Sequence, residues 1–426
     1  MNVEVVTIGD ELLLGFTVDT NAAHLARELA AVGIGVARRS TIGDDPAQIA
    51  AAVKEALDRT GAVITTGGLG PTSDDLTKPS IAALFGREMR FDDTIWEELK
   101  VRWKSYRWPG GIPASNRQQA MIPAGAVILK NRHGSAPGIW LEDDRSPTPR
   151  WVAMLPGVPR EMRGMLADEL LPRLRARVTG SPSAIASRTL RTIGIGESAL
   201  ADLLGPLAKG PKGLPLAYLP SVEGTDLRLT ARHAVAAEAT RALDAGAAEL
   251  RAVLGSYVYG EEKADLAAVV LDLLRSRAMK IAVAESCTGG MLGARLTAVA
   301  GASDVMLGGV IAYANAVKES HLGVRAETLR VHGAVSEETA REMATGVRER
   351  FGAQVGVSVT GIAGPDGGTA EKPVGAVCMA VAVGDAVRST KVQMIGDRDE
   401  IRRRSAQAAL NLVRRALSET PQGSST

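Results

Sequence analysis

Short apolar runs typical of buried strands alternate along this chain with stretches of helical spacing. Residues 3–8 form the first apolar run, and residues 62–66 form a later one that ends directly in a glycine-rich loop. Between them, Leu25, Leu29 and Val32 recur at positions i, i+4 and i+7, which lie on one helix face. The alternation of strand and helix predicts an α/β fold with largely parallel sheets and right-handed crossovers.

This pattern occurs twice, on either side of a segment in which the strand and helix signals follow a different order. Residues 1–175 form the first α/β pattern, and residues 258–426 form the second, in which Ser336 is expected to cap a helix. Residues 176–257 show strand, glycine-turn and helix signals without a polar cluster, and predict a small α+β domain. Residues 259–265 are the expected linker. A chain of 426 residues is long enough for such domains, at about 100–200 residues each.

Composition and charge argue against several classes of protein. Hydrophobic residues make up 45% of the chain, and the net charge of +2 produces no overall field that would attract nucleic acid or membrane. No apolar run approaches the ~20 residues of a bilayer-spanning helix, and no signal-like segment precedes the first strand. The two cysteines, Cys287 and Cys378, lie in different segments, so neither a disulfide nor a metal pair is expected. A cytoplasmic location without membrane contact is therefore predicted.

The stretch TTGGLGPTSDD places glycines and acids at the end of a predicted strand. Gly67, Gly68 and Gly70 let the backbone approach a ligand, and successive N–H groups there suit a phosphate. Asp74 and Asp75 supply the hard oxygen ligands that Mg²⁺ prefers.

A second pair of acids, Asp10 and Glu11, follows the first predicted strand. The carboxyl ends of parallel strands share one edge of a sheet, which is where ligands of open α/β sheets bind. The two acid pairs together predict a metal-dependent site for a phosphorylated ligand. The alternative is a glycine-rich turn whose aspartates cap the next helix.

The stretch AESCTGG, residues 284–290, is a strand–turn–helix junction with two possible nucleophiles. Ser286 precedes Cys287, and Thr288, Gly289 and Gly290 lead into the next helix, whose first N–H groups are expected to stabilise an oxyanion. Adjacent residues in a turn point in different directions, so only one of the two nucleophiles faces the pocket. A small, polarizable cysteine suits the packed side, which favours Ser286 as the nucleophile.

A serine nucleophile needs a base, and no histidine lies at an obvious strand end. Lys318 follows another predicted strand, and a desolvated lysine loses its proton readily enough to act as a base. Tyr313 either orients a reacting group or packs in the core. Thr360 ends a third strand, and Arg398 and Arg402 share one helix face, where either could hold a phosphate.

With these motifs in view, nearly the whole chain resembles the CinA family of competence/damage-inducible proteins. TIGDELLLG, TTGGLGPTSDD and LPGVPREM look like its molybdopterin-binding-type domain, which the family associates with a metal-dependent ADP-ribose pyrophosphatase activity. The middle segment is similar to a KH-type domain. AESCTGG, YANAVK, VTGIAGPDGG and GDRDEIRR look like its nicotinamide mononucleotide (NMN) deamidase domain.

The resemblance implies that Ser286 attacks the carboxamide of NMN, that Lys318 activates it and that ammonia leaves. Tyr313, Thr360 and one of the two arginines, Arg398 or Arg402, belong to the same implied site. The implied substrate-binding residues are Cys287, Thr288, Gly289, Gly290, Asn315 and Gly361 for the deamidase and Asn21, Gly67, Gly68 and Gly70 for the N-terminal site. Asp10, Glu11, Asp74 and Asp75 are the expected metal ligands. The deamidase is expected to need no cofactor, and the family suggests a homodimer.

Two other functions remain open on the sequence. The N-terminal domain is alternatively a non-catalytic module that binds a pterin or a nucleotide. RNA binding by the middle segment is disfavoured, because this segment is not expected to present basic clusters and exposed aromatic residues of the kind that RNA recognition uses.

Overall fold

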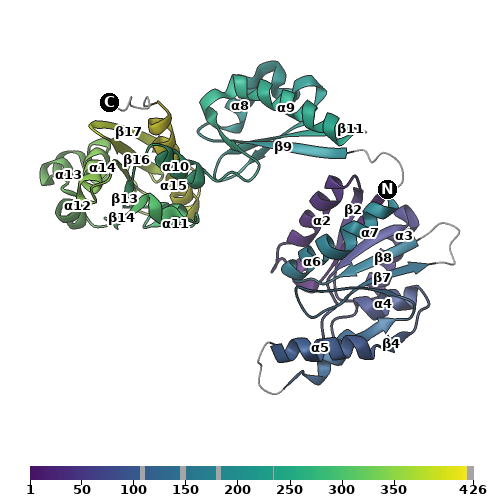
Figure 1. Cartoon of the computed structure of the whole chain (residues 1–426). Helices are drawn as coiled ribbons and strands as arrows, with labels where there is room; N and C mark the ends of the chain where they lie inside the picture. The colour runs from purple at the N-terminus through teal and green to yellow at the C-terminus, as the bar shows by residue number, and fades with distance from the viewer. Residues whose placement is uncertain (106–110, 144–149, 179–183, 234, 420–426) are drawn as a thin grey trace. The chain divides into compact units, whose positions relative to one another are not determined.

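The computed structural model describes residues 1–105, 111–143, 150–178, 184–233 and 235–419. The chain divides into two compact units, Met1–Ala186 with Ala231–Thr240, and Ser187–Thr230 with Arg241–Thr426. It contains three larger sheets, and we call the parts built around them the N-terminal, middle and C-terminal domains (Figure 1). Among the described residues, no helix is long and apolar enough to cross a membrane.

The N-terminal sheet has the strand order β2-β1-β3-β8-β7-β6. The first four of these strands are parallel, as the sequence predicts, and the last two are antiparallel. Their bounds are Gly35–Ile42 for β2, Asn2–Ile8 for β1, Ala62–Thr66 for β3, Arg150–Leu155 for β8, Gly138–Asp143 for β7 and Val127–Leu129 for β6. The carboxyl ends of β1, β2 and β3 therefore meet at one edge.

Helices cover both faces of this sheet. Val5 of β1 packs in a cluster with Leu25 of α2, whereas its neighbour Val6 packs in a second cluster with Ile49 of α3. This alternation is the period of two expected for a strand buried on both faces. The helical segments are α1 (Asp10–Leu13), α2 (Thr20–Ala31), α3 (Pro46–Thr60), α4 (Thr77–Leu84), α5 (Asp93–Ser105), α6 (Pro159–Met165) and α7 (Leu171–Arg177). The 3₁₀ segment Ala114–Ala120 and a small sheet of β4 (Met89–Phe91) and β5 (Met121–Pro123) complete the domain.

The sequence also suggests Thr20 as the N-cap of a helix and a single helix over residues 161–174, and the structure corrects both expectations. Thr20 is the first helical residue and not the cap, because the side chain of Asp19 accepts the hydrogen bond from Ala22 N–H. The single helix expected over residues 161–174 is instead α6, a π-helical turn at Leu166–Leu170, and α7.

The middle domain is a four-stranded sheet with the order β10-β11-β9-β12 and two main helices. The strands are β9 (Ala184–Thr192), β10 (Leu216–Pro220), β11 (Thr225–His233) and β12 (Val258–Glu261), and the helices are α8 (Glu197–Leu204) and α9 (Ala236–Leu254). The expected linker over residues 259–265 is partly wrong, because its first three residues belong to β12 and pair with β9. Tyr259 in this strand is buried, which removes it from any solvent-exposed linker.

The C-terminal sheet has the order β14-β13-β15-β16-β17. Strands β13 (Ile281–Glu285), β14 (Met306–Ile311) and β15 (Val355–Gly361) are parallel, while β16 (Ala376–Val383) and β17 (Ala386–Gln393) are antiparallel. The fold is thus mixed α/β with a parallel half in each of the two large sheets. The carboxyl ends of β13, β14 and β15 meet at one edge.

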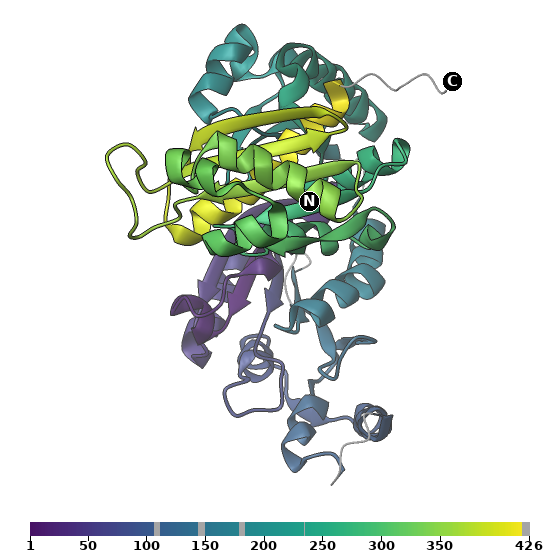
Figure 2. The same cartoon turned by 90° about the vertical axis from the view of Figure 1, so that its left-hand side faces the viewer.

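Two layers of helices enclose the C-terminal sheet. The helices α10 (Leu266–Ser276), α11 (Met291–Thr297) and α15 (Arg398–Glu419) pack on one face in a shared cluster. On the other face lie α12 (Asn315–Leu322), α13 (Ala326–His332) and α14 (Glu337–Arg350), which appear as green helices in front of the strands in Figure 2. Ser336 is the N-cap of α14, as predicted, because its hydroxyl accepts a hydrogen bond from Thr339 N–H.

The Ser336 cap generates a stability prediction. Ser336→Ala leaves the Thr339 N–H without its acceptor and should destabilise the C-terminal domain by about 1 kcal/mol, whereas Ser336→Asp should retain most of the stability. Urea unfolding followed by circular dichroism measures both effects. Equal midpoints for wild type and Ser336→Ala would contradict the capping role.

Candidate active sites

Three strand ends of the C-terminal sheet bring the predicted deamidase residues together. Ser286 directly follows β13, and its N–H donates to Val359 O of β15 at 2.9 Å. Lys318 lies in α12, just beyond β14, and its Nζ is 3.2 Å from Ser286 Oγ. The structure therefore pairs the two side chains that the sequence analysis selected, although they are 32 residues apart.

The surroundings of Lys318 suit an amine that changes its protonation state. Nζ also donates to Ala312 O at 2.8 Å and to Tyr313 O at 3.2 Å. In the ammonium form, the three N–H groups have three acceptors; in the neutral form, two N–H groups donate to the carbonyls and the lone pair accepts from Ser286. The residue is only 1% exposed, and this desolvation lowers the pKa of Lys318 below the ordinary lysine value.

The buried carboxylate of Glu285 shapes the loop that carries Ser286. It accepts hydrogen bonds from Gly290 N–H at 3.0 Å, Leu292 N–H at 3.0 Å and Gly293 N–H at 2.8 Å. These helix-start groups are the ones that sequence analysis offered to an oxyanion, so that expectation is wrong for all three. Glu285 was not among the residues expected from the sequence, although an acid immediately before a turn and a helix is a typical source of such hydrogen bonds.

Cys287 faces the core on the other side of this loop. Its side chain is 6% exposed and packs in the cluster that includes Leu292 and Ile401. Burial raises the pKa of the Cys287 thiol to about 12, which keeps it protonated near neutral pH. A protonated, packed thiol is a poor nucleophile.

Tyr313 and Arg398 lie together at the surface beside the serine loop. Tyr313 is 63% exposed, so the alternative that it packs in the core is wrong. Arg398 donates to Tyr313 Oη at 3.2 Å and also to Gly364 O. Arg402 instead donates to Thr288 O at 3.0 Å, which ties helix α15 to the loop. Asn315 is exposed at the start of α12.

The third strand end contributes buried hydroxyls. Thr360 donates to Ala334 O at 2.7 Å, so its proton is directed to the loop before α14. Gly361, the last residue of β15, is partly exposed. Thr288 is fully buried, and among the described residues its Oγ1 has no hydrogen-bond partner. Gly289 and Gly290 both have positive φ, at 57° and 96°, which a residue with a side chain rarely adopts.

At the N-terminal sheet edge lies a cavity of about 400 Å³. The residues that line it include six of the predicted set, namely Glu11, Gly67, Gly68, Gly70, Asp74 and Asp75. Gly67 has φ of 114°, and a Cβ there would lie 2.0 Å from Ile8 O. Only glycine therefore fits where β3 turns beside β1.

Asp75 has a structural role in this loop. Its carboxylate accepts from Gly70 N–H at 2.6 Å and from Thr72 N–H at 2.8 Å. The alternative, in which the aspartates cap the next helix, is wrong, because Leu76 is the N-cap of α4 and no side chain of the described residues caps that helix. Asp75 instead stabilises the glycine-rich turn itself. Asp74 is an exposed side chain on the cavity wall.

Asp44, which was not among the predicted residues, lines the cavity in place of Asp10. Asp10 Oδ1 accepts from Asp44 N–H, and Asp10 N–H donates to Asp44 Oδ2. Asp44 lines the cavity, whereas Asp10 is not part of its lining. Burial and the charges of Asp10, Glu11 and Asp74 raise the pKa of Asp44. Asp44 follows β2 at the same sheet edge. The sequence suggests a strand over residues 34–40, and an acid shortly after that strand was the signal that could have identified Asp44.

The remaining lining includes further polar groups that were not predicted. Gln119 and Ser135 line the cavity, and Gln119 Nε2 donates to Ser135 Oγ at 3.3 Å. Asn21, by contrast, lies in a smaller neighbouring cavity, where its Nδ2 donates to Gly157 O at 2.7 Å. Its Oδ1 is buried without a hydrogen-bond partner in the described part of the chain.

The oxygen atoms on the cavity wall are of the chemical type that a hard divalent cation binds. Glu11, Asp44 and Asp74 all line one cavity and repel one another, and carboxylate oxygens are the preferred ligands of Mg²⁺. Within the described ranges, however, no three histidine, cysteine, aspartate or glutamate side chains lie close enough to form a complete metal site. Asp75 is already occupied with backbone N–H groups, which makes it the poorest of the predicted ligands.

Three family models match successive parts of the chain. The probable molybdopterin binding domain matches residues 4–176, the damage-inducible protein CinA KH domain matches residues 187–260, and the CinA C-terminal domain matches residues 263–417. The first and last ranges contain the two candidate sites, and the middle range contains the sheet of the middle domain.

Relatives match over almost their entire length. A CinA-like protein of Gemmatimonas aurantiaca is 61% identical, over 98% of this chain and 96% of the relative. A CinA-like protein of a Synechococcus strain is 46% identical, over 97% and 96% of the two chains. A putative competence-damage inducible protein of Symbiobacterium thermophilum is 42% identical, over 98% and 99%. The chain therefore belongs to the CinA family of competence/damage-inducible proteins.

Proposed function

We propose that the C-terminal domain is an amidohydrolase that converts NMN to nicotinate mononucleotide and ammonia. The observation that carries this proposal is the contact between Lys318 Nζ and Ser286 Oγ at 3.2 Å, in a setting that lowers the pKa of the lysine. A serine beside a desolvated lysine is a recognised nucleophile–base pair. The substrate comes from the resemblance of the surrounding motifs to the family's NMN deamidase domain.

In the first step, neutral Lys318 accepts the hydroxyl proton while Ser286 Oγ bonds to the carboxamide carbon. The carbonyl oxygen becomes an oxyanion. In the described chain, the N–H groups of Cys287 and Thr288 donate to no backbone carbonyl, and we propose them as the oxyanion donors, because Glu285 occupies those further along.

In the second step, the Lys318 ammonium returns its proton to the amide nitrogen, the C–N bond breaks and ammonia leaves. Ser286 then carries an ester of the nicotinate group. Water attacks this ester, and Lys318 accepts one proton from water and passes it to Ser286 Oγ. The carboxylic acid that forms gives its remaining proton to solvent or to the released ammonia, and the product leaves as the carboxylate. One water is consumed and one ammonia formed, with the lysine returned to its neutral state.

The surface residues suit recognition of a phosphorylated substrate. Arg398 is exposed and close to both Tyr313 and Gly364, whereas Arg402 is committed to the Thr288 carbonyl. We therefore propose Arg398 as the phosphate ligand and Arg402 as a support of the serine loop.

For the N-terminal domain we propose a metal-dependent ADP-ribose pyrophosphatase. Its support is the cavity that the glycines of the loop and several carboxylates line together. Gly67 N–H donates to Leu155 O and Gly70 N–H to Asp75, so these two N–H groups are already engaged.

One or two of the carboxylates of Glu11, Asp44 and Asp74 would bind the metal, and water and phosphate oxygens would complete its coordination. When bound, the metal would neutralise charge on the diphosphate. The glycine-rich turn would hold the phosphates. A non-catalytic pterin- or nucleotide-binding module is the competing function, and the family model for this part of the chain names a molybdopterin-binding domain.

The choice of nucleophile is tested by two adjacent alanine variants. Ser286→Ala should lower kcat for NMN by about 10³-fold or more, as is typical when a nucleophile is lost. Cys287→Ala should lose far less activity, because its thiol is protonated and packed. Ammonia release and product chromatography measure both. An inactive Cys287→Ala beside an active Ser286→Ala would assign the reaction to the thiol.

The role of Lys318 predicts the direction of the pH dependence. Only the neutral amine accepts a proton, so kcat/KM should rise with pH through the pKa of Lys318, which lies below 10.5, and fall as the pH drops through that value. Lys318→Arg keeps a permanent positive charge and should abolish this rising limb together with most activity. A wild-type-like profile in a folded Lys318→Arg variant would remove Lys318 as the base.

The N-terminal proposal is tested by measuring hydrolysis of ADP-ribose, as the only nucleotide present, at a fixed Mg²⁺ concentration. Asp74→Asn should lower hydrolysis steeply because it removes a proposed metal ligand, while Glu97→Gln on the surface of α5 is the matched control. NMN deamidation should be unchanged in both variants. Binding of ADP-ribose without hydrolysis by the wild type would favour the non-catalytic module.

A further inference from the structure

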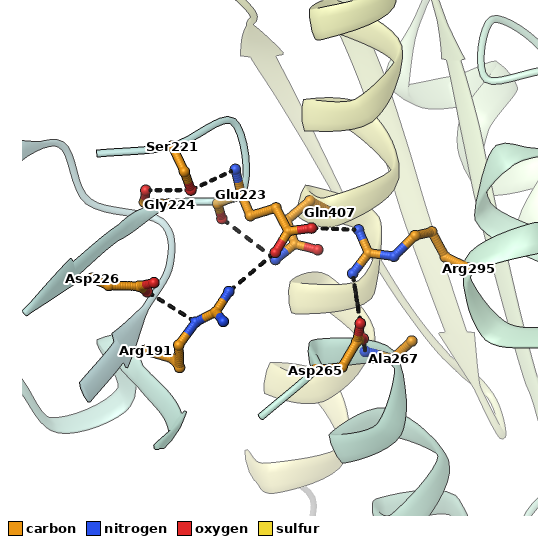
Figure 3. Close-up of polar contacts among 9 residues, drawn as sticks. All are labelled: Arg191, Ser221, Glu223, Gly224, Asp226, Asp265, Ala267, Arg295 and Gln407. Carbon is orange, nitrogen blue, oxygen red and sulfur yellow. Dashed lines mark hydrogen bonds and ion pairs between the residues drawn. The ribbon is translucent and has the colours of Figure 1, made fainter. Parts of the chain in front are cut away.

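The turn between β10 and β11 in the middle domain is held by its own hydrogen bonds. Ser221 N–H donates to Gly224 O at 2.8 Å, and the Ser221 hydroxyl donates to the same carbonyl at 3.0 Å. Glu223 N–H donates to Ser221 Oγ at 3.2 Å. We call residues 221–224 the bridging turn (Figure 3). Because its backbone is fixed, Glu223 projects from a firm support.

Glu223 lies between arginines of two domains. Its Oε2 is 3.1 Å from Arg191 of β9, in the middle domain, and its Oε1 is 3.4 Å from Arg295 of α11, in the C-terminal domain (Figure 3). Its main-chain carbonyl accepts a hydrogen bond from Gln407 of α15 at 3.4 Å. These contacts lie within one compact unit of the chain. One residue of the middle domain thus contacts two helices of the C-terminal domain.

Those two helices are the ones that support the serine loop, residues 286–290. Helix α11 starts where this loop ends, and its first N–H groups bind Glu285. Helix α15 reaches the loop through Arg402, which donates to Thr288 O. The bridging turn therefore contacts both supports of the loop that carries the nucleophile.

An apolar contact joins the same elements. Ile193 and Tyr259 of the middle domain belong to the buried cluster that also contains Cys287, Leu292 and Ile401. The residue next to the nucleophile is consequently packed in a core that two domains share. A shift of the middle domain would reach the serine loop through this packing as well as through Glu223.

We infer that the bridging turn positions the amidase site and that Glu223 is the positioning residue. This inference rests on the proposed amidase function. Arg191 also pairs with Asp226 at 3.0 Å, and Arg295 also pairs with Asp265 at 3.3 Å, so each arginine keeps one carboxylate when Glu223 is neutralised. A positive charge at position 223 would instead repel both guanidinium groups and move α11 relative to the turn.

The test uses Glu223→Lys in the full-length protein with NMN as substrate. We expect kcat to fall about three- to thirtyfold, as for other residues that act on a site through intervening contacts, with KM little changed. Glu223→Gln should keep most of the activity. The matched control is Glu249→Lys, which makes the same charge change on α9, where Glu249 pairs with Lys212 inside the middle domain.

A second measurement does not depend on the amidase reaction. Cys287 and Cys378 are the two cysteines of the chain, and both are buried. If Glu223→Lys loosens the serine loop, Cys287 should react with a thiol reagent about three- to thirtyfold faster, while Cys378 in β16 keeps its rate. Mass spectrometry separates the two sites. A wild type without amidase activity would refute the proposed function, and the labelling would still test the positioning.

A double variant links the effect to Arg295. Charge reversal at position 223 should have a smaller effect in an Arg295→Ala background, because one of the repelled partners is absent. Equal kcat and equal Cys287 labelling in Glu223→Lys and Glu249→Lys would overturn the inference. Faster labelling of both cysteines together would also overturn it, since that result indicates general destabilisation.

Discussion

The hydrogen bonds of the Glu285 carboxylate to the start of α11 are the interaction on which the proposed deamidase site depends. A buried carboxylate is tolerated only when its oxygens are well hydrogen-bonded, and Glu285 has three backbone N–H donors. Closing these bonds requires the chain to turn back over Glu285, and the positive φ values of Gly289 and Gly290 permit that turn. As a result, the Ser286 hydroxyl faces Lys318, whereas the Cys287 side chain packs in the core.

The two candidate sites use the same part of the fold for opposite electrostatic purposes. Both lie where parallel strands end beside glycine-rich loops, so backbone N–H groups and side chains from distant parts of the sequence converge. In the C-terminal site, desolvation favours a neutral Lys318. In the N-terminal cavity, Glu11, Asp44 and Asp74 concentrate negative charge, which suits a cation. A phosphorylated ligand would approach these carboxylates only with a cation between them. The sheet edge thus brings the side chains of each site together, and the charge around them determines which ligand or reaction the site suits.

The middle domain is integrated with the C-terminal domain through polar and apolar contacts. Besides Glu223, Arg414 of α15 donates to Ser256 O at 2.6 Å, close to the start of β12. Tyr259 in β12 is buried in the shared cluster. Burial of a large aromatic side chain stabilises such a contact more than exposed ion pairs do. The core, and not the salt bridges alone, therefore holds the bridging turn against the two helices.

The sequence by itself determined the elements and the residue types of the sites. Apolar periodicity located β3 and α2 closely, and the cap at Ser336 was visible, because these depend on neighbours a few residues away. The sequence also placed Ser286, Lys318 and Thr360 at or just beyond the ends of three predicted strands, and the strand order of the folded sheet brings these ends together. Tertiary structure decided which groups remain available. Glu285 occupies the helix-start N–H groups, Asp44 replaces Asp10 on the cavity wall, and Asp75 is engaged by its own loop. Such outcomes depend on which donor lies within about 3 Å of which acceptor, and that distance is set by packing between segments far apart in the chain.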